Sequence, residues 1–146
     1  MPASGIKLAD SNVWLAAVFS GHQHHTQAKA WFEAQLEGTV AFCRITQLAL
    51  LRHLTNSKIM GSFVQTQQQA WITFDTLAID PRVVFLKEPP GLEGFFRAFA
   101  NSNSPSHEHW TDAYLAALSL ATGTEFVTFD GDFRKFKGLK VSLLGI

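Results

Sequence analysis

Four aspartates of this sequence, Asp10, Asp112, Asp130 and Asp132, could form a metal site if the fold brings them together. Taken singly, each has an ordinary structural explanation, such as capping a helix or opening a turn. Clustered carboxylates, however, repel one another, and folding tolerates this poorly unless a cation neutralises them. Oxygen-only ligands favour hard ions such as Mg²⁺ or Mn²⁺. An ion of this kind activates water and stabilises the charge that develops on a phosphodiester.

The elements that must position these aspartates follow an α/β pattern, because short apolar runs of β-type composition alternate with helical periodicity. We expect a mainly parallel sheet whose strands are Ile6–Ala9, Thr39–Cys43, Val83–Leu86, Glu125–Thr128 and Val141–Leu144. We expect helices from about Asn12, over Thr26–Glu37, from a Thr46 cap to Leu54, over Gln65–Leu77 and Gly91–Ala100, and over Asp112–Leu120 with Thr111 as cap. The Asn- and Ser-rich stretch Asn101–His109 is typical of a flexible loop.

This order of elements predicts that the candidate residues meet at one edge of the sheet. In a parallel sheet the carboxyl ends of the strands share an edge, and the crossover helices begin there. Asp10 and Asp130 follow predicted strands, whereas Asp112 and Gln47 open predicted helices. All four are therefore expected on the same rim, although they lie far apart in the chain.

Four segments in this order resemble the motifs of PIN-domain nucleases, and most closely those of the VapC-type toxins of bacterial toxin–antitoxin pairs. They are Leu8–Leu15, Arg44–Arg52, Trp110–Ala117 and Val127–Phe133. The resemblance covers essentially the whole chain and implies a single PIN-like domain over residues 1–146. The implied fold is a three-layer sandwich with a central, mainly parallel five-stranded sheet flanked by helices. The implied activity is Mg²⁺- or Mn²⁺-dependent endoribonuclease cleavage of RNA, with a small cognate antitoxin as partner and usually a homodimer.

Carried over residue by residue, the resemblance assigns the acidic site to Asp10, Asp112 and Asp130, as both catalytic residues and metal ligands. Thr128 takes the place of the hydroxyl residue that supports the site, and Asp132 that of a less regular fourth carboxylate.

One position departs from the family pattern, because Gln47 stands where the family commonly has a glutamate. An amide oxygen can coordinate a metal directly or through water, but it brings no charge. Either the metal site is weaker, or Asp132 supplies the missing carboxylate, or Gln47 merely lies at the rim. The weaker site leaves a second functional class open: a catalytically weakened PIN domain that serves as an RNA- or antitoxin-binding module.

The overall charge does not announce a nucleic-acid-binding protein, since twelve basic and twelve acidic residues cancel. Four basic residues nevertheless crowd behind Asp130 and Asp132, namely Arg134, Lys135, Lys137 and Lys140. They form either a solvated surface turn or a patch that binds RNA phosphates. His107 and His109 precede Asp112 closely enough to reach a substrate for acid–base work.

The single cysteine, Cys43, lies in an apolar run, where a buried and inert thiol is the expected state. The first residues contain no apolar signal-peptide region, and no stretch reaches the roughly 18 apolar residues of a membrane span. The expectation is a soluble protein of the reducing cytoplasm, without a membrane partner.

Overall fold

The computed structural model describes residues 5–145, and its centre is a parallel sheet of five short strands in the order β3-β2-β1-β4-β5. The strands are β1 Lys7–Ala9, β2 Val40–Phe42, β3 Val83–Phe85, β4 Glu125–Thr128 and β5 Val141–Leu143. Every neighbouring pair is parallel. The predicted sheet is confirmed, with β1, the first strand in sequence, at its centre beside β4.

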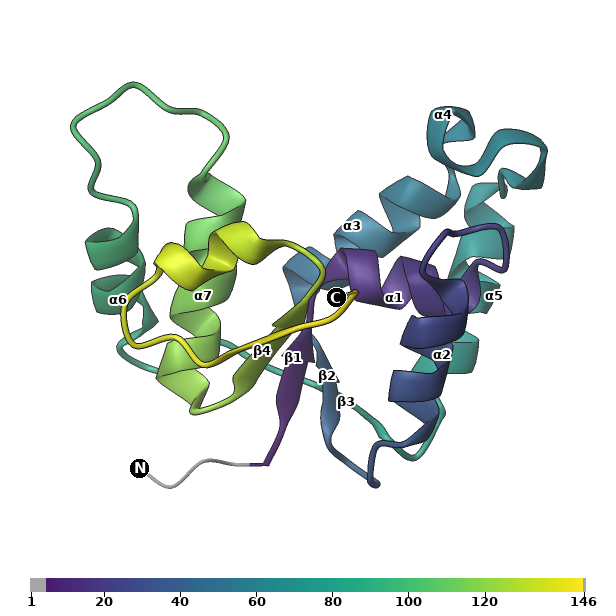
Figure 1. Cartoon of the computed structure of the whole chain (residues 1–146), viewed down its shortest axis with the longest axis horizontal. Coiled ribbons are helices and arrows are strands. Elements are labelled where there is room, and N and C mark those ends of the chain that lie inside the picture. Colours follow the sequence, from purple (N-terminus) through teal and green to yellow (C-terminus); the bar gives the residue numbers. More distant parts are fainter. Residues whose placement is uncertain (1–4, 146) are drawn as a thin grey trace.

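Helices cover both faces of the sheet and complete the expected three layers (Figure 1). They are α1 Ser11–Val18, α2 His25–Glu33, α3 Arg44–Leu54, α4 Ser57–Met60, α5 Gln67–Ala78, α6 Leu92–Phe99 and α7 Trp110–Thr122. There are also two short 3₁₀ helices among the described residues: η1 Gly61–Phe63, between α4 and α5, and η2 Gly131–Lys135, between β4 and β5. Within residues 5–145, no helix is both long and apolar enough to cross a membrane.

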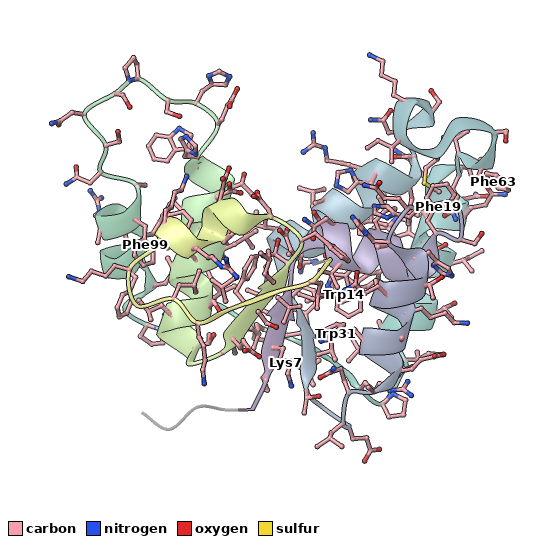
Figure 2. All side chains as sticks on the ribbon, viewed as in Figure 1. Lys7, Trp14, Phe19, Trp31, Phe63 and Phe99 are labelled. Atoms are coloured by element: carbon pink, nitrogen blue, oxygen red, sulfur yellow. The ribbon has the colours of Figure 1, made fainter. Side chains whose placement is uncertain are left out.

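Alternation along the strands divides the core into two layers, because successive side chains of a strand point to opposite faces. Val40 and Phe42 pack with α1, α3 and α5, whereas Ala41 between them packs with α6, α7 and η2. In the first layer, Trp14 stacks on Phe42 with ring centroids 3.8 Å apart and planes 7° from parallel. Figure 2 shows Trp14 between the sheet and the helices of that layer. Cys43 is a buried free thiol in the second layer, as predicted.

Several element boundaries differ from the sequence-based expectation. Helix α3 begins at Arg44 rather than at a Thr46 cap, because Cys43 is the extended cap residue and the Thr46 hydroxyl accepts a hydrogen bond from its backbone N–H at 2.9 Å. Helix α7 begins at Trp110, so Thr111 lies inside its first turn. The sequence analysis missed α4, which begins where the Asn56 side chain accepts a hydrogen bond from the backbone N–H of Lys58.

Helix α2 ends at Glu33, four residues earlier than predicted. The side-chain amide of Gln35 donates to the carbonyl of Trp31 at 2.8 Å, and this carbonyl would otherwise accept from the next turn of the helix. The competition between a side-chain donor and the helical backbone explains the early end.

Candidate active site

Asp10 is held at the junction of β1 and α1 by hydrogen bonds to both of its carboxylate oxygens. Its Oδ1 accepts from the backbone N–H of Ser11 at 2.8 Å, as expected of a residue that caps α1. Its Oδ2 accepts from the hydroxyl of Thr128 at 2.7 Å. Only 8% of Asp10 is exposed. The carboxylate therefore has a fixed orientation at the carboxyl edge of the sheet.

Thr128 connects this carboxylate to the rest of the acidic cluster. The fully buried Thr128 ends β4, and its Oγ1 accepts from the backbone N–H of Asp130 at 3.0 Å while donating to Asp10. Asn12 donates to the same oxygen at 3.4 Å. Asp130 in turn accepts from the backbone N–H of Asp132 at 2.9 Å and caps η2. One hydroxyl thus fixes two aspartates of the predicted site relative to each other.

Asp112 reaches the cluster from the first turn of α7. It is partly buried, and burial raises the pKa of its carboxyl, as do the charges of Asp130 and Asp132, whereas Lys135 and His109 lower it. The same electrostatic coupling acts on Asp10. The pKa of Asp10 is raised from 3.8 to about 6, mainly by burial and to a smaller extent by the charges of Asp112 and Asp130, while the hydrogen bonds from Thr128 and Ser11 act in the opposite direction.

The donor set suits a hydrated hard cation better than a cage made only of protein ligands. Among the described residues, no three His, Cys, Asp or Glu side chains stand close enough to hold a metal ion by themselves. Mg²⁺ usually keeps several of its waters and binds through one or two carboxylates. A buried carboxylate with a raised pKa, facing two further carboxylates, lacks a positive charge that such an ion would supply.

Gln47 is buried in the first turn of α3, and its side-chain oxygen is already in use. The guanidinium of Arg44 donates to Oε1 of Gln47 at 2.5 Å and lies 5.1 Å from the centroid of the Phe85 ring. Arg44 is not among the site residues predicted from the sequence. Its spacing of three residues from Gln47, at the start of a helix, places both on one helical face and was the available indication.

The four basic residues that follow Asp132 do not share one location. The Nζ atom of Lys135 lies 3.2 Å from Nδ1 of His109, and the charge of Lys135 lowers the pKa of Asp112. Lys140 instead precedes β5 and lines a cavity with Lys7, which Figure 2 labels at the start of β1. Lys140 therefore lies at the amino edge of the sheet, opposite the aspartates. Arg134 and Lys137 are exposed.

The family model for the PIN domain matches residues 7–139, which include every residue of the acidic cluster. The chain belongs to the PIN-domain family. It is 42% identical over 142 residues to Ribonuclease VapC41 of Mycobacterium tuberculosis, covering 94% of this chain and 97% of that protein. It is 27% identical over 135 residues to Ribonuclease VapC44 of the same species, covering 84% of each.

Solved structures share the fold of this PIN domain at low sequence identity. VapC20 of Mycobacterium tuberculosis, described as a sarcin-ricin loop cleaving toxin, superposes with a TM-score of 0.64 at 15% identity, covering 88% of this chain and 92% of that one. VapBC2 of Rickettsia felis gives a TM-score of 0.66 at 12% identity, covering 94% and 98%. The resemblance to VapC-type PIN domains, read from four motifs, is confirmed.

Removing the charge of Asp10 should stabilise the metal-free PIN domain in a pH-dependent way. With its pKa raised to about 6, Asp10 ionises in the unfolded chain at lower pH than in the folded one, so wild type loses stability as pH rises from about 4 to 6. The Asp10→Asn variant lacks this loss, and its advantage should grow to about 3 kcal/mol by pH 7. Urea unfolding with chelator at several pH values measures it. A pH-independent difference would contradict the electrostatic explanation.

The metal requirement should depend on the charge at position 47. In Gln47→Glu, one carboxylate oxygen can keep the Arg44 contact while the other adds an anionic ligand, directly or through water. Direct titration with Mn²⁺ should show tighter binding in Gln47→Glu than in wild type. If the curves of wild type, Gln47→Glu and Gln47→Ala overlay, Gln47 is not part of the metal site.

Proposed function

We propose that this protein is an Mg²⁺- or Mn²⁺-dependent endoribonuclease that acts as the toxin of a toxin–antitoxin pair. The observation that carries the proposal is the buried carboxylate of Asp10, fixed by Thr128 and electrostatically coupled to Asp112 and Asp130. Membership of the PIN-domain family and 42% identity to a named ribonuclease over nearly the full chain support it.

In this mechanism Asp10, Asp112 and Asp130 would hold a hydrated cation together, in part through water molecules that the ion retains. When bound, the ion would supply an activated water and neutralise charge that develops on the scissile phosphodiester. Thr128 keeps Asp10 in one orientation, so the carboxylate does not have to reorganise when substrate arrives. Asp132 adds negative charge beside Asp112, and Lys135 places a cation on the same side, where it can bind a phosphate oxygen.

Gln47 supports the alternative, a weakened PIN domain that binds RNA or antitoxin without cutting RNA. Its amide brings no charge, and Arg44 occupies its oxygen. The two functions separate cleanly, because a binding module would retain single-stranded RNA at saturating Mn²⁺ without cleaving it.

We also infer two protein partners, a small antitoxin and a second copy of the chain. Solved structures that share this fold include the VapBC2 and VapBC-1 toxin–antitoxin assemblies of Rickettsia felis and nontypeable Haemophilus influenzae. Exposed apolar side chains of η1 and α5, including Phe63 and Ile72, offer a surface of the kind that protein partners cover.

Replacing Asp112 with Asn should reduce RNA cleavage roughly a hundredfold or more, because the site loses a charged ligand and stabilisation worth several kcal/mol. Asp10→Asn and Asp130→Asn should act alike, and all three should abolish growth arrest on expression. The matched control is Asp75→Asn. Asp75 is exposed on α5, which covers the face of the sheet opposite to the one that α7 covers. Full activity in a folded Asp112→Asn variant would refute the proposed site.

Neutralising Lys135 should weaken RNA binding and lower its salt dependence by about 0.7 in slope, as expected for one lost contact to single-stranded RNA. Binding can be followed at several salt concentrations in the Asp112→Asn background, where the RNA stays intact. Lys140→Gln is the control, because Lys140 lies at the opposite edge of the sheet. An unchanged slope in Lys135→Gln would show that Lys135 is a solvated surface residue that does not bind RNA phosphates.

A further inference from the structure

We propose that a cavity beside the acidic cluster binds an unpaired nucleobase of single-stranded RNA, stacked on Trp110. The cavity has a volume of about 360 Å³ and lies between the end of α6, the loop from 101 to 109 and η2. The proposal rests on the proposed ribonuclease function and adds a site for the base next to the site for the phosphate. Its walls combine aromatic rings, hydroxyl groups and a lysine, which are the groups that recognise unstacked bases and their phosphates.

The position of the cavity links it to the carboxylates. Lys135 and His109 both line it, and the Nζ of Lys135 lies 3.2 Å from Nδ1 of His109. The charges of both residues also act on Asp112. His109 and Asp112 are three residues apart at the start of α7, so they lie on the same side of the helix. A nucleotide whose phosphate reached Lys135 would therefore have its base at the mouth of this cavity.

Trp110 is the exposed ring that such a base would cover. It is 57% exposed, although large aromatic side chains usually bury most of their surface. The ring packs edge-on against Phe96, with centroids 6.3 Å apart and planes at 75°, which holds it in place from one side. A ring held by one neighbour and largely open to solvent is suited to stacking, which tolerates any base because each has a flat face.

The other residues that line the cavity are apolar or carry hydroxyl groups, so the cavity can accommodate the polar edge of a base as well as its flat face. Phe99 and Phe136 contribute apolar surface, with ring centroids 5.1 Å apart, and Figure 2 labels Phe99 at the end of α6. Serines from the loop line the same cavity, and the hydroxyls of Ser102 and Ser104 lie 2.8 Å apart. Hydroxyls can both donate and accept, so they can pair with the polar edge of a base.

The test compares two tryptophans in similar settings. Trp71 is 48% exposed and packs edge-on against Phe74 at 6.2 Å, but it belongs to α5 on the other face of the sheet. In the Asp112→Asn background, Trp110→Ala should lower affinity for a short oligoadenylate roughly tenfold, and Trp71→Ala should leave it unchanged. Trp110→Phe keeps an aromatic ring and should recover most of the affinity. The salt slope should stay that of the parent, because no phosphate contact is lost.

A second measurement remains decisive even if Trp110→Ala fails to fold. An oligomer of ribose phosphates without bases should bind the parent protein more weakly than oligoadenylate does, and should not quench its tryptophan fluorescence. Equal affinity for the two oligomers would overturn the base site, as would equal behaviour of Trp110→Ala and Trp71→Ala. A loss of antitoxin binding alone, with RNA binding intact, would also overturn it and assign the cavity to a protein partner. If wild type neither binds nor cleaves RNA, the proposed function itself fails, whatever the variants do.

Discussion

The hydrogen bond from the Thr128 hydroxyl to the Asp10 carboxylate joins the two strands on which the acidic cluster is built. β1 and β4 pair side by side at the centre of the sheet, so their carboxyl ends deliver Asp10 and Asp130 to one place. The backbone N–H of Ser11 binds one oxygen of the Asp10 carboxylate, and the Thr128 hydroxyl binds the other. Thr128 donates to Asp10 and accepts from the backbone N–H of Asp130, so the positions of the two aspartates are fixed by the pairing of the strands. Helix α7, which carries Asp112, is held against the same strands by the apolar packing of the second core layer.

Holding these carboxylates close together destabilises the folded protein when they are charged and no cation is bound. Burial raises the pKa of Asp10 against two hydrogen bonds that favour its charged form, and Asp112 and Asp130 act in the same direction as burial. The two apolar layers on either side of the sheet, with Trp14 and Phe42 stacked in one of them, must compensate for that strain. The site and the core are thus energetically opposed parts of one fold.

Much of the fold could be predicted because hydrophobic periodicity is a local property of the sequence. The alternation of strands and helices along the chain then placed the aspartates at one edge of a parallel sheet. Two features of the site could not be predicted, because one depends on which donor a side chain binds and the other on where the chain turns back. The contact between Arg44 and Gln47 cannot be read from residue types, since a glutamine accepts from many donors. Lys140 looked like part of one basic run with Lys135, but η2 and the turn after it carry the chain back across the sheet before β5 begins. Sequence proximity therefore misplaced it.

The separation of Thr128 from Asp10 along the chain, 118 residues, sets when the cluster can exist. The pairing of β1 with β4 at the centre of the sheet cannot form before both strands have been synthesised. Contacts this distant in sequence form late in folding, since long loops must close first. A growing polypeptide that has not yet emerged as far as β4 has neither Thr128 nor Asp130. The nascent chain therefore cannot assemble the acidic cluster before β4 and the residues that follow it have been synthesised.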